Sequence, residues 1–149
     1  AGPEAPVLPG TWSFEAHEAY DSYRFHGTVP SKEMADWAPS FLPEGYIESK
    51  RTDLGTLMEI TYDCKDLDMW ITFSYLRLAE GSGFDLDNEH HVVTEISVQG
   101  MDGYLYTASE DKLNAVVWFN ETLRYGFLLS SRLPPDTLLK VAESVNTKS

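Results

Sequence analysis

Acidic and histidine side chains gather in one short stretch, Asp85-Leu86-Asp87-Asn88-Glu89-His90-His91. Alternating oxygen ligands suit calcium, and paired imidazoles suit zinc or other borderline metals. The stretch lacks the glycine and the distal glutamate of a calcium-binding loop, and adjacent histidines in a strand point to opposite faces. We therefore expect a solvated acidic loop, and we keep four side chains as candidate metal ligands: Asp85, Asp87, Glu89 and His91.

A second set of histidines and carboxylates lies near the N-terminus, at Glu15, His17, Glu18 and His26. Their spacing fits no metal-ligand motif, so we expect surface residues there. The single cysteine, Cys64, can form neither an internal disulfide nor a Cys-x-x-Cys zinc site. The sequence contains no Gly-x-Ser-x-Gly turn and no phosphate-binding Gly-x-x-x-x-Gly-Lys-Ser/Thr loop. We therefore predict a protein that is not an enzyme, with no catalytic residue and no cofactor.

Aromatic side chains are the other group that could bind a ligand. Trp70, Tyr104, Tyr106 and Trp118 all fall in segments that we expect to be strands. Such residues ordinarily pack in the core and against their cross-strand neighbours. The alternative is an apolar groove between the sheet and a helix, which would take a lipid, a peptide or another hydrophobic ligand. These four residues are the candidate binding site.

Alternation of side chains with a period of two predicts the strands that position these aromatics. Between residues 69 and 76, Met69, Ile71, Phe73 and Tyr75 share one face. Similar patterns predict further strands at residues 57–62, 92–98, 104–106, 114–119 and 123–130. The glycine-rich, acidic residues 79–91 are expected to form the longest loop.

Two segments have helical signals. In residues 137–145, apolar residues recur at helical spacing (Leu138, Val141, Ala142 and Val145), and prolines precede them. Near the N-terminus, Ser31 is a candidate N-cap for a short helix over residues 30–37. One striped helix after a run of strands predicts a helix lying across one face of a sheet.

The expected fold class is α+β. An antiparallel sheet of about six strands packs against a C-terminal amphipathic helix, and a short N-terminal helix precedes the sheet. Residues 1–30 are expected to form a linker-like, aromatic arm with a strand near residues 23–28. Residues 31–149 are expected to form one domain.

The charge of the chain limits its partners. Its 149 residues include 24 acidic and 11 basic side chains, for a net charge of −13. This charge disfavours both nucleic acids and anionic membrane surfaces. No apolar run approaches the roughly 18 residues of a membrane span, so we expect membrane contact only through an anchor outside this sequence. The expected state is a monomer whose partner is an unidentified protein, peptide or lipid-like ligand.

The order of short motifs over residues 39–146 resembles a bacterial family called domain of unknown function 4367. The segments that carry the resemblance are Pro39-Ser40-Phe41-Leu42-Pro43-Glu44-Gly45-Tyr46, Ile96-Ser97-Val98-Gln99-Gly100-Met101-Asp102-Gly103, Val116-Val117-Trp118-Phe119, Arg124-Tyr125-Gly126-Phe127 and Leu138-Leu139-Lys140-Val141-Ala142-Glu143-Ser144-Val145. The resemblance implies an extracytoplasmic part of a membrane-anchored protein, similar to anti-sigma factors or their regulators. It brings no catalytic residue. The chain departs from the family in its aromatic N-terminal arm and in residues 81–91.

These observations lead to one expected function and two alternatives. We expect a non-enzymatic, extracytoplasmic sensor or protein- and ligand-interaction module of a membrane-anchored bacterial protein. The first alternative is a metal-binding domain or metal-dependent hydrolase that uses the acidic residues 85–91. The second alternative is a structural spacer domain.

Overall fold

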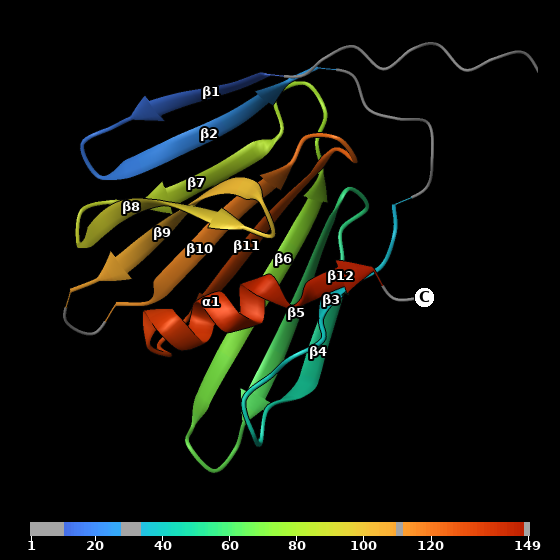
Figure 1. Ribbon diagram of the computed structural model, residues 1–149, viewed down its shortest axis with the longest axis vertical. Coiled ribbons are helices and arrows are strands. Elements are labelled where there is room, and N and C mark those ends of the chain that lie inside the picture. Colours follow the sequence, from blue (N-terminus) through green and yellow to red (C-terminus); the bar gives the residue numbers. More distant parts are fainter. Residues whose placement is uncertain (1–10, 28–33, 110–111, 148–149) are drawn as a thin grey trace, which may run out of the picture.

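The computed structural model describes residues 11–27, 34–109 and 112–147, and these residues form twelve strands and one helix (Figure 1). In chain order the elements are β1 (Thr11–Ala16), β2 (Tyr20–His26), β3 (Trp37–Pro39), β4 (Ile47–Asp53), β5 (Leu57–Cys64), β6 (Met69–Arg77), β7 (Gly83–Asp87), β8 (His91–Val98), β9 (Met101–Ala108), β10 (Asn114–Asn120), β11 (Tyr125–Ser131), α1 (Pro135–Glu143) and β12 (Val145–Thr147).

The described strands form three antiparallel sheets. The largest has seven strands in the order β4-β5-β6-β11-β10-β9-β8. A three-stranded sheet has the order β1-β2-β7, and β12 pairs with β3. Figure 1 shows α1 lying across the strands of the seven-stranded sheet, with β1, β2 and β7 together at the top of the view.

Each face of the seven-stranded sheet is covered by a different part of the chain. On one face, Phe73, Trp118 and Phe127 pack with Leu138 and Val141 of α1. The opposite face packs against the three-stranded sheet, and this second core comprises mainly Tyr23, Phe25, Leu76, Leu78, Phe84, Leu86, Tyr106, Ala115, Val117 and Phe119. The seven-stranded sheet is therefore the central layer of the fold.

The helix α1 begins after Pro134, with Pro135 in its first turn, and Asp136 lies near its positive N-terminal end. Its residues Leu138, Val141 and Ala142 are buried against the sheet. The helix was predicted to continue to residue 145, but it ends at Glu143, and Val145 belongs to β12. No helix in the described ranges has the length and apolar character needed to cross a membrane.

The predicted α+β class is wrong, because the described residues are mostly β-structure with a single short helix. The sheet of about six strands is also wrong, since twelve strands divide among three sheets. The short N-terminal helix is wrong where the chain is described: residues 34–36 have no regular structure and β3 follows them. Residues 30–33 of that prediction lie outside the described residues. Residues 37–39 form a strand and not the end of a helix because they pair with β12, in which Thr147 lies opposite Trp37.

The loop predicted over residues 79–91 is wrong in its centre, where β7 forms. Phe84 and Leu86 are buried and alternate with exposed Asp85 and Asp87. Apolar and acidic residues that alternate in this way are typical of a strand with one buried face. In the sequence alone, the glycines and acids around them favour a loop instead. The partner of β7 is β2, in which Tyr23 pairs with Phe84. The strand β2 begins at Tyr20, closer to the N-terminus than the strand predicted near residues 23–28. Residues 1–10 of the predicted arm lie outside the described residues.

Candidate functional site

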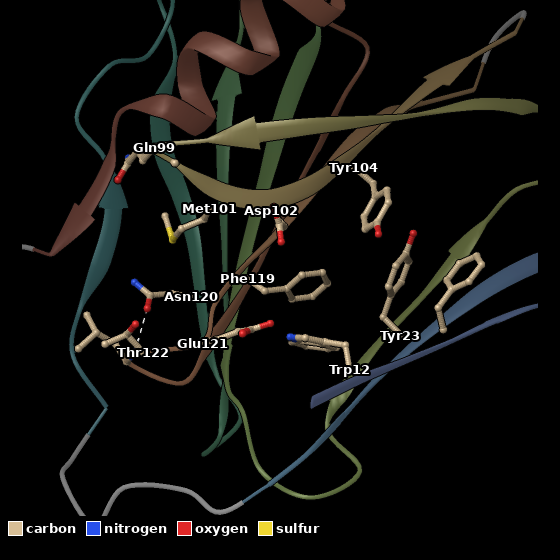
Figure 2. A pocket seen from close by; sticks show the side chains of 13 residues that line it. Trp12, Tyr23, Gln99, Met101, Asp102, Tyr104, Phe119, Asn120, Glu121 and Thr122 are labelled. Carbon is tan, nitrogen blue, oxygen red and sulfur yellow. Dashed lines mark hydrogen bonds between the residues drawn. The ribbon is translucent and has the colours of Figure 1, made fainter. Parts of the chain in front are cut away.

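An open groove of about 840 Å³ lies between the β1–β2 hairpin and the ends of β9 and β10. Residues of the turn after β8 and of the turn after β10 also line it. Figure 2 shows the side chains that line it. They are Trp12, Phe14, Tyr23, Gln99, Gly100, Met101, Asp102, Tyr104, Phe119, Asn120, Glu121, Thr122 and Leu123. We call this feature the aromatic groove.

Aromatic rings from two sheets form the walls of the groove. The ring centroids of Trp12 and Phe119 are 3.8 Å apart, and those of Tyr23 and Tyr104 are 5.4 Å apart. Phe14, which is largely exposed, adds a ring 5.2 Å from that of Tyr23. Such close, tilted pairs are favourable beyond the area that they bury. Figure 2 shows the rings of Trp12, Tyr23, Tyr104 and Phe119 gathered together, with Trp12 and Tyr23 coming from the hairpin and Tyr104 and Phe119 from the seven-stranded sheet.

The strand register explains why rings of the seven-stranded sheet reach the groove. Tyr104 of β9 lies opposite Val117 of β10, and Phe119 lies two residues beyond Val117. Alternate residues of a strand share a face, so Tyr104 and Phe119 point to the same side. Between them Gly103 lets the strands approach, because a Cβ there would lie 2.6 Å from the carbonyl oxygen of Val117.

A buried polar network holds the hairpin on the seven-stranded sheet. The hydroxyl of Tyr106 donates to Oδ2 of Asp21 over 2.6 Å, and Nδ2 of Asn88 donates to Oδ1 over 2.6 Å. The hydroxyl of Tyr23 lies 2.6 Å from that of Tyr106, so it donates to the Tyr106 oxygen. Burial raises the pKa of Tyr23 to about 12. Burial, reinforced by the hydrogen bond to Asp21, also raises the pKa of Tyr106.

The rim of the groove is acidic. Asp102 and Glu121 line it, and none of its described lining residues is a lysine, an arginine or a histidine. Glu95 of β8 lies opposite Tyr104, and a smaller hollow lined by Glu95 shares Asp102 and Tyr104 with the groove. Burial raises the pKa of Tyr104, and the carboxylates of Glu95 and Asp102 raise it further. The groove therefore has a negative potential.

Polar side chains at the ends of the groove are mostly engaged within the protein. Nε2 of Gln99 donates to the carbonyl oxygens of Glu143 and Val145, both over 2.7 Å. Oδ1 of Asn120 accepts the amide N–H of Leu123. By contrast, Asp102 and Glu121 are exposed at the rim. Figure 2 shows the Asp102 carboxylate directed into the groove and that of Glu121 beside the ring of Trp12.

The four residues predicted to form a binding site lie in different parts of the fold. Tyr104 lines the groove. Tyr106 is fully buried in the polar network. Trp118 is fully buried on the opposite face, where its ring stacks on Phe127 at 5.1 Å. Trp70 is 39% exposed near the start of β6. Under the helix, the space in which the groove was expected holds packed side chains of the core.

Three of the four predicted metal ligands, Asp85, Asp87 and His91, use their side chains in other contacts, and Glu89 is exposed. Both carboxylate oxygens of Asp85 accept hydrogen bonds from Arg24, at 2.9 and 3.0 Å. Burial alone would raise the pKa of Asp85, but the Arg24 guanidinium holds it below its ordinary value. Asp87 accepts the backbone N–H of Glu89, and Nε2 of His91 donates to the carbonyl oxygen of Leu113 over 2.8 Å. In the part of the chain that the structure describes, no three histidine, cysteine or acidic residues are placed to share a metal ion.

The histidines of the N-terminal set pair with separate carboxylates. His17 lies 3.6 Å from Glu15, whereas Nδ1 of His26 lies 2.6 Å from Glu80. Cys64 is a free, buried thiol.

Sequence reasoning missed most of the groove. Trp12, Phe14 and Tyr23 lie in the segment that was expected to be an arm, and Asp102 and Glu121 lie between predicted strands. The available signal was the spacing of aromatics two residues apart, as in Trp12 and Phe14, which is typical of a strand face. Nothing in the sequence alone places that face over β9 and β10.

The fold and the groove together define a mostly β domain in which a hairpin and a large sheet enclose an open aromatic cleft. Residues 36–145 match the model of a family described as "Domain of unknown function (DUF4367)". The chain belongs to this family. Comparison with curated proteins and with solved structures gave no match. Because β1 and β2 precede residue 36, the groove joins residues inside the matched range to residues outside it.

Proposed function

We propose that this chain is a non-enzymatic interaction or sensor module that binds its partner in the aromatic groove. It would act outside the cytoplasmic membrane, as part of a membrane-anchored bacterial protein. The family resemblance described above supports this setting, including its similarity to anti-sigma factors. The groove supports the binding role, since its volume of about 840 Å³ falls in the range of ligand pockets.

The observation that carries the proposal is the meeting of four rings from two sheets around one open space. Trp12 and Tyr23 come from the hairpin, and Tyr104 and Phe119 come from the seven-stranded sheet. Tyr23 and Phe119 are buried, so the aromatic surface that is open to solvent comes from the half-buried rings of Trp12 and Tyr104. Such a surface is typical of interaction sites, because a ligand that covers it removes apolar area from water. Phe14, which also lines the groove, adds to this surface and is 55% exposed.

The direct test is a titration followed by two-dimensional nitrogen–proton NMR of the isotope-labelled chain. Three chemically different probes are used separately: a short arginine-containing peptide, the disaccharide chitobiose and micelles of dodecylphosphocholine. We expect at least one probe to shift the indole signal of Trp12 and the amide signals of Asp102 and Leu123. The exposed indole of Trp70, which does not line the groove, is the internal control. A groove whose signals respond to none of the three probes contradicts the proposal.

A further inference from the structure

We infer that the groove binds a basic side chain from an extended peptide segment of a partner protein. In this arrangement an arginine or lysine lies against the rings of Trp12 and Tyr104, with its charge near the carboxylates of Asp102 and Glu121. The inference rests on the proposed function and deepens it by naming the class of partner.

The first support is the charge of the groove. Asp102 and Glu121 line it, Glu95 stands next to Tyr104, and no described lining residue carries a positive charge. The whole chain has a net charge of −13, which attracts cations and repels phosphates and anionic headgroups over long range. A basic partner is therefore favoured over an anionic lipid.

The second support is the type of ring that the groove presents. Cations bind to the faces of tryptophan and tyrosine because the ring quadrupole is negative there, and arginine does so more often than lysine. The chain forms this contact twice in its own interior. The guanidinium carbon of Arg77 lies 5.1 Å from the ring centroid of Tyr125, and that of Arg124 lies 5.1 Å from the centroid of Phe25. Trp12 and Tyr104 offer the same chemistry at a surface.

The third support is that the hydrogen-bonding groups of the groove favour a basic side chain over a neutral sugar. Recognition of sugar hydroxyls on an aromatic surface relies on hydrogen bonds to polar side chains nearby. Here the Gln99 amide nitrogen is engaged by two backbone carbonyls, and the Asn120 oxygen is engaged by the amide of Leu123. The polar side chains exposed at the rim are Asp102, Glu121 and Thr122, and the two carboxylates among them are acceptors that carry charge. Positively charged donors match them best.

Calorimetric titration with a matched pair of peptides tests the inference. The probe is an acetylated and amidated Gly-Ser-Arg-Ser-Gly peptide. Its partner replaces arginine by citrulline, which keeps the shape and removes the charge. We expect the arginine peptide to bind at least about tenfold more tightly than the citrulline peptide, because both the cation–π contact and the carboxylate pairing need the charge. Added salt should weaken the binding of the arginine peptide more than that of the citrulline peptide.

Two double variants locate the effect. Asp102→Asn with Glu121→Gln removes the two rim charges while keeping the size of both side chains. Asp66→Asn with Glu89→Gln makes the same change in net charge at exposed residues that do not line the groove. We expect the first variant to lose most of the arginine preference and the second to keep it. Unchanged near-ultraviolet circular dichroism confirms that both are folded.

The outcomes distinguish failure of the basic-segment inference from failure of the proposed binding function. Equal binding of the arginine and citrulline peptides, or equal effects of the two double variants, overturns the basic-segment inference. If neither peptide binds while chitobiose or micelles shift the Trp12 signal, the inference fails but the proposed function stands. If no probe perturbs the groove, both fail.

Discussion

The hydroxyl of Tyr106 donates a 2.6 Å hydrogen bond to the buried carboxylate of Asp21, which lies 85 residues earlier in the chain. The two residues belong to different sheets, β9 and β2. Two residues away along the same strands, Tyr104 and Tyr23 form opposite walls of the aromatic groove. The hydrogen bond therefore fixes the position of the hairpin over the seven-stranded sheet, and with it the width of the groove.

Replacing Tyr106 by phenylalanine should lower the free energy of unfolding by about 2 kcal/mol, since a buried carboxylate loses a hydrogen-bond donor. Urea denaturation followed by circular dichroism measures the loss. Tyr20→Phe is the control, because the ring of Tyr20 is exposed, and it should change stability by less than about 0.5 kcal/mol. Equal stabilities of Tyr106→Phe and the parent chain would show that the network does not anchor the hairpin.

The buried tyrosines make the fold sensitive to alkali. Burial raises the pKa of Tyr23 and of Tyr62 from 10.0 to about 12. The unfolded chain releases these protons at lower pH than the folded chain does. Their contribution to stability is therefore complete below about pH 10 and is lost as the pH rises toward 12. Urea denaturation at a series of alkaline pH values should show this decline.

Tyr23→Phe provides the comparison for the alkaline decline. The variant lacks one of the ionisable hydroxyls, so its stability should fall less steeply between about pH 10 and 12 than that of the parent chain. The slope is compared rather than the absolute stability, because the variant also loses its hydrogen bond to Tyr106. Parallel declines in the two proteins would contradict the burial of the Tyr23 hydroxyl.

The contact between Trp12 and Phe119 should be energetically coupled. Their ring centroids are 3.8 Å apart, so a double-mutant cycle with Trp12→Leu and Phe119→Leu should give a coupling energy of about 0.5–1.5 kcal/mol. A second cycle combines Trp12→Leu with Trp70→Leu, two positions that share no ring contact, and it should be additive within about 0.5 kcal/mol. Additivity in the first cycle as well would mean that the hairpin does not close over β10.

The pairing of β7 with β2 depends on Gly83. A Cβ at this residue would lie 1.6 Å from the carbonyl oxygen of Tyr23, so Gly83→Ala should force the strands apart and cost at least about 2 kcal/mol. Amide hydrogen exchange should then become faster in β7 and β2. The control is Gly81→Asn: Gly81 has a φ of +82°, no atom lies within 4 Å of a Cβ there, and asparagine tolerates this backbone region. Unchanged exchange in Gly83→Ala would contradict the strand assignment of residues 83–87.

Strands of the seven-stranded sheet could be predicted where one face is buried and the other is not. In β5, buried Met58, Ile60 and Tyr62 alternate with more exposed residues, and this contrast is visible in the sequence. The stripe of α1 could be predicted for the same reason. The end of α1 could not, because Val145 continues the apolar spacing but pairs with Pro39 in a strand. The local sequence pattern does not distinguish a buried helix position from a buried strand position.

The short strands and the groove depend on partners that are distant in sequence. The five residues of β7 form a strand because β2 lies beside them, and β2 lies about sixty residues earlier (Tyr23 pairs with Phe84). The same holds for the candidate site. Tyr104 was among the predicted binding residues, but its ring neighbour Tyr23 comes from a segment that looked like an arm. Trp118 has equal aromatic character and lies in the core, since its alternation phase directs it to the other face.

The measurement that tests groove binding most directly is a set of intermolecular nuclear Overhauser effects in the complex with the arginine peptide. The side-chain methylene protons of the bound arginine should give effects to the ring protons of Trp12 and Tyr104. Asp102→Asn with Glu121→Gln should abolish them at the same peptide concentration. Effects confined to Trp70 or to other residues outside the groove, at saturating peptide, would contradict binding of a basic segment between the two sheets.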